Sequence, residues 1–196
     1  MFKGTPDYPS GRFSAIIAEN GGRENAFTGR DYTAYYQLVG KDRLEIAMQL
    51  EADRMRNLSL PEDEFDKELN VVKEERLWRT EDNPEAQTFE HFNAVAYLNS
   101  PYQNPVIGWM TDLDNMKVED LREWYEKYYH PANATLVVVG DVDPEDVYEL
   151  AKKYYGVYKS EPLADAKPRA EAQPLGLRSI KVKAPAKVPY VLMGYH

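Results

Sequence analysis

The 196-residue sequence has no cysteine, no apolar run long enough to span a bilayer and no cluster of lysine and arginine. Without cysteine, disulfide bonds and thiolate metal ligands are excluded, although the compartment stays open. Without a long apolar run or an apolar signal-like start, the sequence predicts no membrane span. A formal charge of -9 and a pI near 4.9 argue against nucleic acid as a partner, because nucleic acid requires a basic patch.

The residues that are present can bury one substantial core. A chain of this length with 43% hydrophobic residues lies near the upper end of a single domain. One domain is therefore the default expectation.

One charged stretch, residues 64–84, stands out as a predicted helix that ends in a loop. Its interior carries Glu68 and Glu75, and their spacing of seven residues is almost two helical turns. The two carboxylates therefore project from the same side of the helix, about 10 Å apart along its axis. An apolar stripe lies beside them, made of Phe65, Leu69 and Val72.

Two interpretations of Glu75 are open. A helix rich in glutamate, lysine and arginine is usually a solvated face, and Glu75 could pair with Arg79 one turn further on. Spacing alone favours this interpretation. The other is that Glu75 lies at the edge of a packed surface, where a carboxylate is costly unless it is paired, protonated or bound to a metal.

The rest of the chain alternates helical and strand patterns and indicates an α+β fold. A hairpin is predicted over 23–40, where an aromatic and β-branched strand follows a short turn. Further helices are predicted over 9–22, 43–56, 84–98, 117–129 and 144–156. Apolar or alternating segments predict strands at 134–139, 177–183 and 188–195. The proline-containing residues 159–176 predict an extended connector.

Several motifs, in one order, resemble the pitrilysin or insulinase family of zinc peptidases, which carries an inverted H-x-x-E-H motif. They are the Glu-x6-Glu helix of Glu68 and Glu75, Met1–Thr5, Gly21–Thr28, Tyr32–Tyr36, His130–Asn133 and Val139–Asp141. One departure stands against them. In the family, H-x-x-E-H lies immediately before the segment that resembles Phe2–Thr5, and the 196 residues do not contain it.

The resemblance implies the family's αβ-roll half-module, a mostly antiparallel sheet with helices packed on one face. Both ends are expected to be truncated, and any targeting segment would lie upstream. The expected division is an incomplete peptidase module over 1–158, a linker over 159–176 and strands returning to the sheet over 177–196.

The resemblance also implies a zinc site and a peptide-binding strand. A catalytic zinc keeps three protein ligands and one open position for water. In the family the third ligand maps onto Glu75, a supporting carboxylate maps onto Glu68, and the general-base glutamate lies in the absent motif. His91, His130 and His196 lack the required spacing, so the chain alone is expected neither to hold zinc tightly nor to hydrolyse peptides.

The segment that matches Asn25, Ala26 and Phe27 is, in the family, an edge strand that pairs with the substrate backbone. The implied partners are therefore a peptide substrate and a second half-module, on the same or another chain. The implied function is that of a fragment of a zinc metalloendopeptidase acting on peptides or small unfolded proteins. The alternative is a non-catalytic partner or scaffold subunit, which the missing motif favours and the retained glutamates disfavour.

Overall fold

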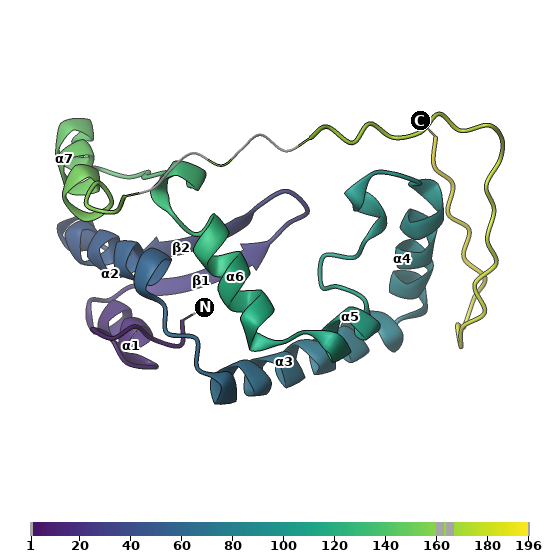
Figure 1. Ribbon diagram of the computed structural model, residues 1–196, viewed down its shortest axis with the longest axis horizontal. Helices are drawn as coiled ribbons and strands as arrows, with labels where there is room; N and C mark the ends of the chain where they lie inside the picture. Colours follow the sequence, from purple (N-terminus) through teal and green to yellow (C-terminus); the bar gives the residue numbers. More distant parts are fainter. Residues whose placement is uncertain (1, 160–162, 164–166, 196) are drawn as a thin grey trace. The chain divides into compact units, whose positions relative to one another are not determined.

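The computed structural model describes residues 2–159, 163 and 167–195 (Figure 1). The chain divides into two compact units. Unit 1 comprises residues 1–65 and 117–165, and unit 2 comprises residues 66–116 and 166–196. The division is discontinuous in sequence, so each unit combines segments that lie far apart along the chain.

Unit 1 contains a hairpin and most of the helices. They are α1 (Arg12–Glu19), β1 (Arg23–Thr28), β2 (Thr33–Leu38), α2 (Leu44–Asn57), α6 (Val118–Tyr128), α7 (Pro144–Tyr154) and the start of α3 (Glu62–Arg76). The two strands are antiparallel, with Arg23 opposite Leu38 and Thr28 opposite Thr33. The predicted hairpin and these helices are confirmed, with ends shifted by a few residues.

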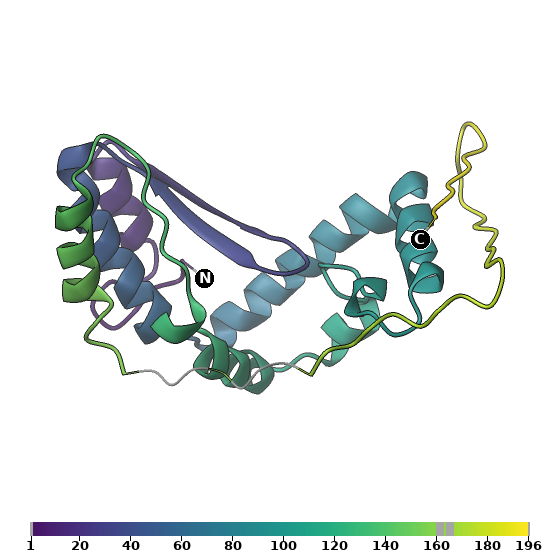
Figure 2. The same ribbon diagram turned by 90° about the horizontal axis from the view of Figure 1, so that it is seen from above.

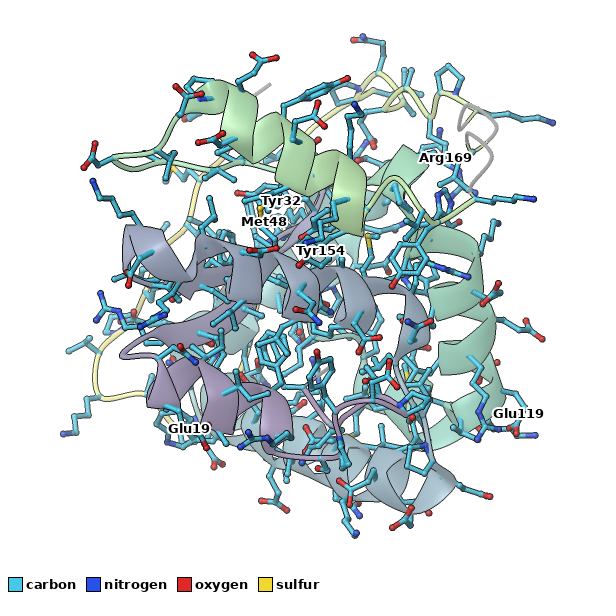
Figure 3. All side chains as sticks on the ribbon, turned by 90° about the vertical axis from the view of Figure 1, so that its left-hand side faces the viewer. Glu19, Tyr32, Met48, Glu119, Tyr154 and Arg169 are labelled. Atoms are coloured by element: carbon cyan, nitrogen blue, oxygen red, sulfur yellow. The ribbon has the colours of Figure 1, made fainter. Side chains whose placement is uncertain are left out.

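The core of unit 1 lies between α1 and α2. Ile17 is fully buried and Leu50 is 2% exposed, and both pack with Phe13 and Ala47. Helix α7 packs along α2, where Lys153 and Tyr154 both bond to the carboxylate of Glu45 (Figure 3). Asp143 caps the start of α7 by accepting hydrogen bonds from two backbone N–H groups, as its position before Pro144 suggests.

Unit 2 contains the larger part of α3, the π-helical turn η2 (Leu77–Glu81), α4 (Pro84–Ala96), the short turn η3 (Pro101–Gln103) and α5 (Met110–Asn115). Asn83 caps α4 by accepting hydrogen bonds from the N–H groups of Glu85 and Ala86. The predicted helix over 84–98 is thus confirmed to within two residues. No helix among the described residues is both long enough and apolar enough to cross a membrane.

The segments predicted as strands at 134–139, 177–183 and 188–195 are not strands in the described part of the chain, whose sheet consists of β1 and β2. A strand needs a neighbour for its backbone N–H and C=O groups, and these segments have no strand paired with them. Val137 and Val139 are accordingly 73% and 92% exposed. Their apolar composition indicates a preference for burial but does not identify a partner.

The α+β class is confirmed by the combination of many helices with a small antiparallel sheet. The division at 158 and 176 stays a prediction. Part of the predicted linker, residues 160–162 and 164–166, lies outside the described residues, as does His196.

Within unit 2, Glu171 contacts the loop that follows α4. Its carboxylate accepts hydrogen bonds from the backbone N–H groups of Leu98, Asn99 and Ser100, at 2.7, 3.1 and 2.8 Å. These bonds, the one from Leu98 foremost, lower the pKa of Glu171 from 4.5 to about 2. Donors that stabilise the charged form act in this direction.

A pH titration is expected to show this contact directly. Because the pKa is lowered on folding, the contact contributes fully above about pH 4.5 and is lost as the pH falls through about 2. The side-chain carboxyl signal of Glu171, followed by NMR, should therefore titrate with a midpoint near 2. A midpoint near 4.5, observed while α4 is still helical, would contradict the contact.

Candidate functional site

Helix α3 carries both glutamates that the sequence singles out. Glu68 and Glu75 are half-buried. One carboxylate oxygen of Glu75 lies 2.7 Å from Nη1 of Arg79, one turn further on, and the Glu75 side chain is 38% exposed. The ion pair of the solvated-face interpretation is therefore present. A pair this exposed contributes at most about 1 kcal/mol, so it leaves Glu75 free to exchange partners at little cost.

The residue next to Glu75, Arg76, anchors this part of α3. Its side chain is 3% exposed, and its two terminal nitrogens each lie 2.8 Å from an oxygen of Glu90 on α4. It also donates to the carbonyl of Gly108 at 2.8 Å. The hydrogen bonds to Glu90 raise the pKa of Arg76, and the forked geometry is the strong, specific form of this ion pair.

The helix changes its winding immediately after Arg76. The turn Leu77–Glu81 is π-helical, and π turns occur frequently at functional sites. Two ion pairs cross the junction, Glu75 to Arg79 and Arg76 to Glu81, the second at 3.0 Å. The sequence does not predict the π turn, because an α-helix and the π turn that continues it have the same local composition.

The described residues do not complete a zinc site. Among them no group of three histidine, aspartate or glutamate side chains is placed to hold a metal ion. His130 is buried in unit 1, with Nε2 3.1 Å from the carbonyl of Lys127, and His91 lies beside Trp109 in unit 2. Structural and catalytic zinc sites use at least three protein ligands, which Glu75 and Glu68 alone do not supply.

The predicted peptide-binding segment lies on β1. Asn25, Ala26 and Phe27 stand opposite Tyr36, Tyr35 and Ala34 of β2. Among the described residues, β2 is the strand that pairs with β1. On β1 itself the N–H of Ala26 donates to Oδ1 of Asn25 at 2.8 Å, and Phe27 is half exposed.

A cluster around the buried Arg54 in unit 1 supports β2, and the sequence does not predict it. The guanidinium of Arg54 stacks 3.7 Å from the ring centre of Tyr35, and Nε donates to Glu51 at 2.9 Å. The hydroxyl of Tyr35 lies 2.8 Å from that of Tyr129, and burial raises the pKa of Tyr35. Tyr35, Arg54 and Tyr129 are distant from one another in sequence, so no local pattern brings them together.

A cavity of about 560 Å³ in unit 1 does not include the predicted site residues. Its polar lining is largely hydrogen-bonded within the protein. Arg56 donates to the carbonyl of Tyr129 at 2.7 Å, Arg122 to that of Leu60 at 2.8 Å, and Tyr125 to that of Arg54 at 2.9 Å. These donors are thus engaged in holding the helices together.

Comparison with known protein families identifies the family of this chain. The model of the insulinase family, peptidase family M16, matches residues 1–109, which is more than half of the chain. The chain belongs to the insulinase family. A second model of the same family, the peptidase M16 inactive domain, matches residues 115–196. The resemblance drawn from the motifs is confirmed, and the family is one of zinc metallopeptidases.

Individual relatives agree with this assignment. The zinc protease PqqE of Helicobacter pylori is 38% identical over 159 residues, which cover 81% of this chain and 36% of the relative. The crystal structure of a protease from Helicobacter pylori matches with a TM-score of 0.83 and 36% identity, over 87% of this chain and 42% of that one. Cytochrome b-c1 complex subunit 1 of Caenorhabditis elegans is 30% identical over 82% of this chain and 34% of the relative.

The insulinase-family chain thus spans about a third to two fifths of the length of these relatives. The match covers 42% of the Helicobacter pylori protease structure, and the predicted half-module fold is confirmed. The roles of individual residues are a separate matter. Asn25–Phe27 belong to unit 1, and Glu68 and Glu75 belong to unit 2. Their roles in binding substrate and metal stay predictions.

Proposed function

We propose that this chain is part of a zinc-dependent metalloendopeptidase that hydrolyses peptide bonds in peptides or small unfolded proteins. The observation that carries the proposal is the pair of half-buried glutamates, Glu68 and Glu75, two turns apart on α3. Both lie within the stretch that matches the insulinase model. The spacing is that of a ligand and a supporting carboxylate in the family.

In this proposal Glu75 is one zinc ligand and Glu68 supports it. The histidine ligands and the general-base glutamate belong to an H-x-x-E-H motif that the 196 residues do not contain. The chain by itself is therefore expected to be inactive and to hold zinc no better than a surface pair of carboxylates would. Arg79 is the cation that neutralises Glu75 when zinc is not bound.

The peptide substrate would pair with β1 as a further strand at Asn25, Ala26 and Phe27, on the edge that does not face β2. Pairing through the backbone supplies affinity without reading side chains, which suits an enzyme that accepts many sequences. A second half-module, on the same chain or another, would complete the protein. The match of residues 115–196 to a second family model supports a modular protein of this kind.

A non-catalytic subunit of the same family is the second candidate. It is favoured by the similarity to cytochrome b-c1 complex subunit 1 and by the inactive-domain match. The two candidates differ in the longer protein. The peptidase requires H-x-x-E-H upstream of Phe2, and the subunit does not.

Zinc binding by the longer protein that includes H-x-x-E-H tests the proposal. It should hold one zinc. Glu68→Gln should lower zinc affinity roughly 10-fold to 100-fold, because Glu68 supports the ligand and does not itself bind the metal. Glu75→Gln should lower zinc affinity more than Glu68→Gln does. A neutral amide is a poorer ligand than a carboxylate. Affinity is measured by competition with a chelator.

The matched control is Glu74→Gln, which removes an exposed carboxylate next to Glu75. It should leave zinc affinity unchanged. If the Glu75→Gln protein holds zinc as tightly as the Glu74→Gln protein, Glu75 is not the ligand. A longer protein without H-x-x-E-H would instead support the non-catalytic subunit.

A further inference from the structure

The C-terminal end of α4 presents two kinds of backbone group to the segment at 170–178. The last carbonyls of the helix accept hydrogen bonds from Nη1 of Arg178, at 3.2 Å for Val95 and 2.6 Å for Ala96. Two residues further on, the N–H groups of the loop donate to Glu171. In Figures 1 and 2 the segment runs beside α4 in both views.

The charges of Glu171 and Arg178 complement the backbone groups at the C-terminal end of α4 that have no partner within the helix. The last carbonyls of a helix have no partner within it and carry partial negative charge, so they favour a guanidinium. The N–H groups of Leu98, Asn99 and Ser100 point at one place and favour a carboxylate. A third contact fixes the direction of the segment, because Nδ2 of Asn99 donates to the carbonyl of Ala170 at 2.9 Å.

Apolar burial contributes little to this contact. Between the two charged residues, Leu175 is fully exposed and Leu177 is 97% exposed. Hydrogen bonds to charged groups therefore supply most of the stability of this contact. Each of them contributes more than a hydrogen bond between neutral groups. A contact of this kind can open without creating a cavity in the core.

We propose that residues 170–178 form a latch, which docks on the end of α4 through the carboxylate of Glu171 and the guanidinium of Arg178. The surface recognises an extended segment that carries these two groups seven residues apart. The latch joins a segment matched by the inactive-domain model to a helix matched by the insulinase model. It does not depend on zinc or on the proposed peptidase activity.

Hydrogen exchange at the backbone amides of Leu98, Asn99 and Ser100, followed by NMR on the 196-residue chain, tests the latch. Glu171→Ala should accelerate exchange of these amides about 10-fold, because they lose a charged acceptor. Glu171→Gln should have a smaller effect, since one acceptor oxygen remains. Arg178→Gln should make trypsin cleave faster after Arg169, which is exposed and immediately precedes the latch (Figure 3).

The controls carry the same change of charge elsewhere. Glu74→Gln is matched to Glu171→Gln, and Lys181→Gln to Arg178→Gln. Both control residues are exposed and lie outside residues 170–178. Far-ultraviolet circular dichroism should be the same for all variants. Exchange in Glu171→Ala no faster than in Glu74→Gln would overturn the proposal. So would a loss of α4 helicity in Glu171→Ala, because the segment would then be part of the core rather than a latch.

Discussion

Replacing Arg76 with methionine is expected to lower the free energy of unfolding of unit 2 by about 3–5 kcal/mol. The substitution leaves the carboxylate of Glu90 buried, at 9% exposure, without its forked partner. A buried charge without compensation costs far more than the pair contributes when it is intact. The measurement is native-state hydrogen exchange of α4 amides as a function of denaturant.

The matched control is Arg79→Met, three residues further along α3 and η2. Its partner Glu75 is 38% exposed, and Arg79 itself is 65% exposed. Water screens such a pair, so the loss should not exceed about 1 kcal/mol. Equal losses for the two variants would show that Arg76 and Glu90 do not form a buried pair.

The double variant with methionine at both 76 and 90 separates charge from packing. It removes both charges, so no carboxylate is left buried without a partner. Its loss in free energy of unfolding should be smaller than the sum of the losses caused by Arg76→Met and Glu90→Met separately. A fully additive loss would mean that the two side chains act independently.

Leu50→Ala is expected to lower the free energy of unfolding of unit 1 by about 2–5 kcal/mol. Leu50 is 2% exposed and packs with Ile17 and Phe13, so truncation loses burial and leaves a cavity. Native-state hydrogen exchange of α2 amides in denaturant measures the effect. Leu175→Ala, at a fully exposed position, should change the free energy of unfolding by less than about 0.5 kcal/mol.

A loss at Leu50 no larger than that at Leu175 would place Leu50 outside the core. The outcome also bears on the two units. Leu50→Ala should leave the exchange of α4 amides much less affected, because α4 belongs to unit 2. Proteins open in cooperative units, so a core substitution acts first on its own unit.

The sequence by itself determined the helices, the hairpin and the spacing of the two glutamates. These features depend on residues close together in the chain. Asn83 before Pro84 and Asp143 before Pro144 begin their helices as caps, and each cap bonds N–H groups two and three residues on. The seven-residue spacing of Glu68 and Glu75 and the family motifs are likewise features of the chain itself.

Only the tertiary structure decided which distant groups meet. The strand-like composition of 134–139 indicates burial in a sheet, but a strand also requires a neighbour, and composition does not supply one. Arg76 and Glu90 are fourteen residues apart and Glu171 lies seventy-one residues beyond Ser100. A charged side chain has the same local pattern whether it is solvated or buried, because its partner is chosen by how the helices and loops pack.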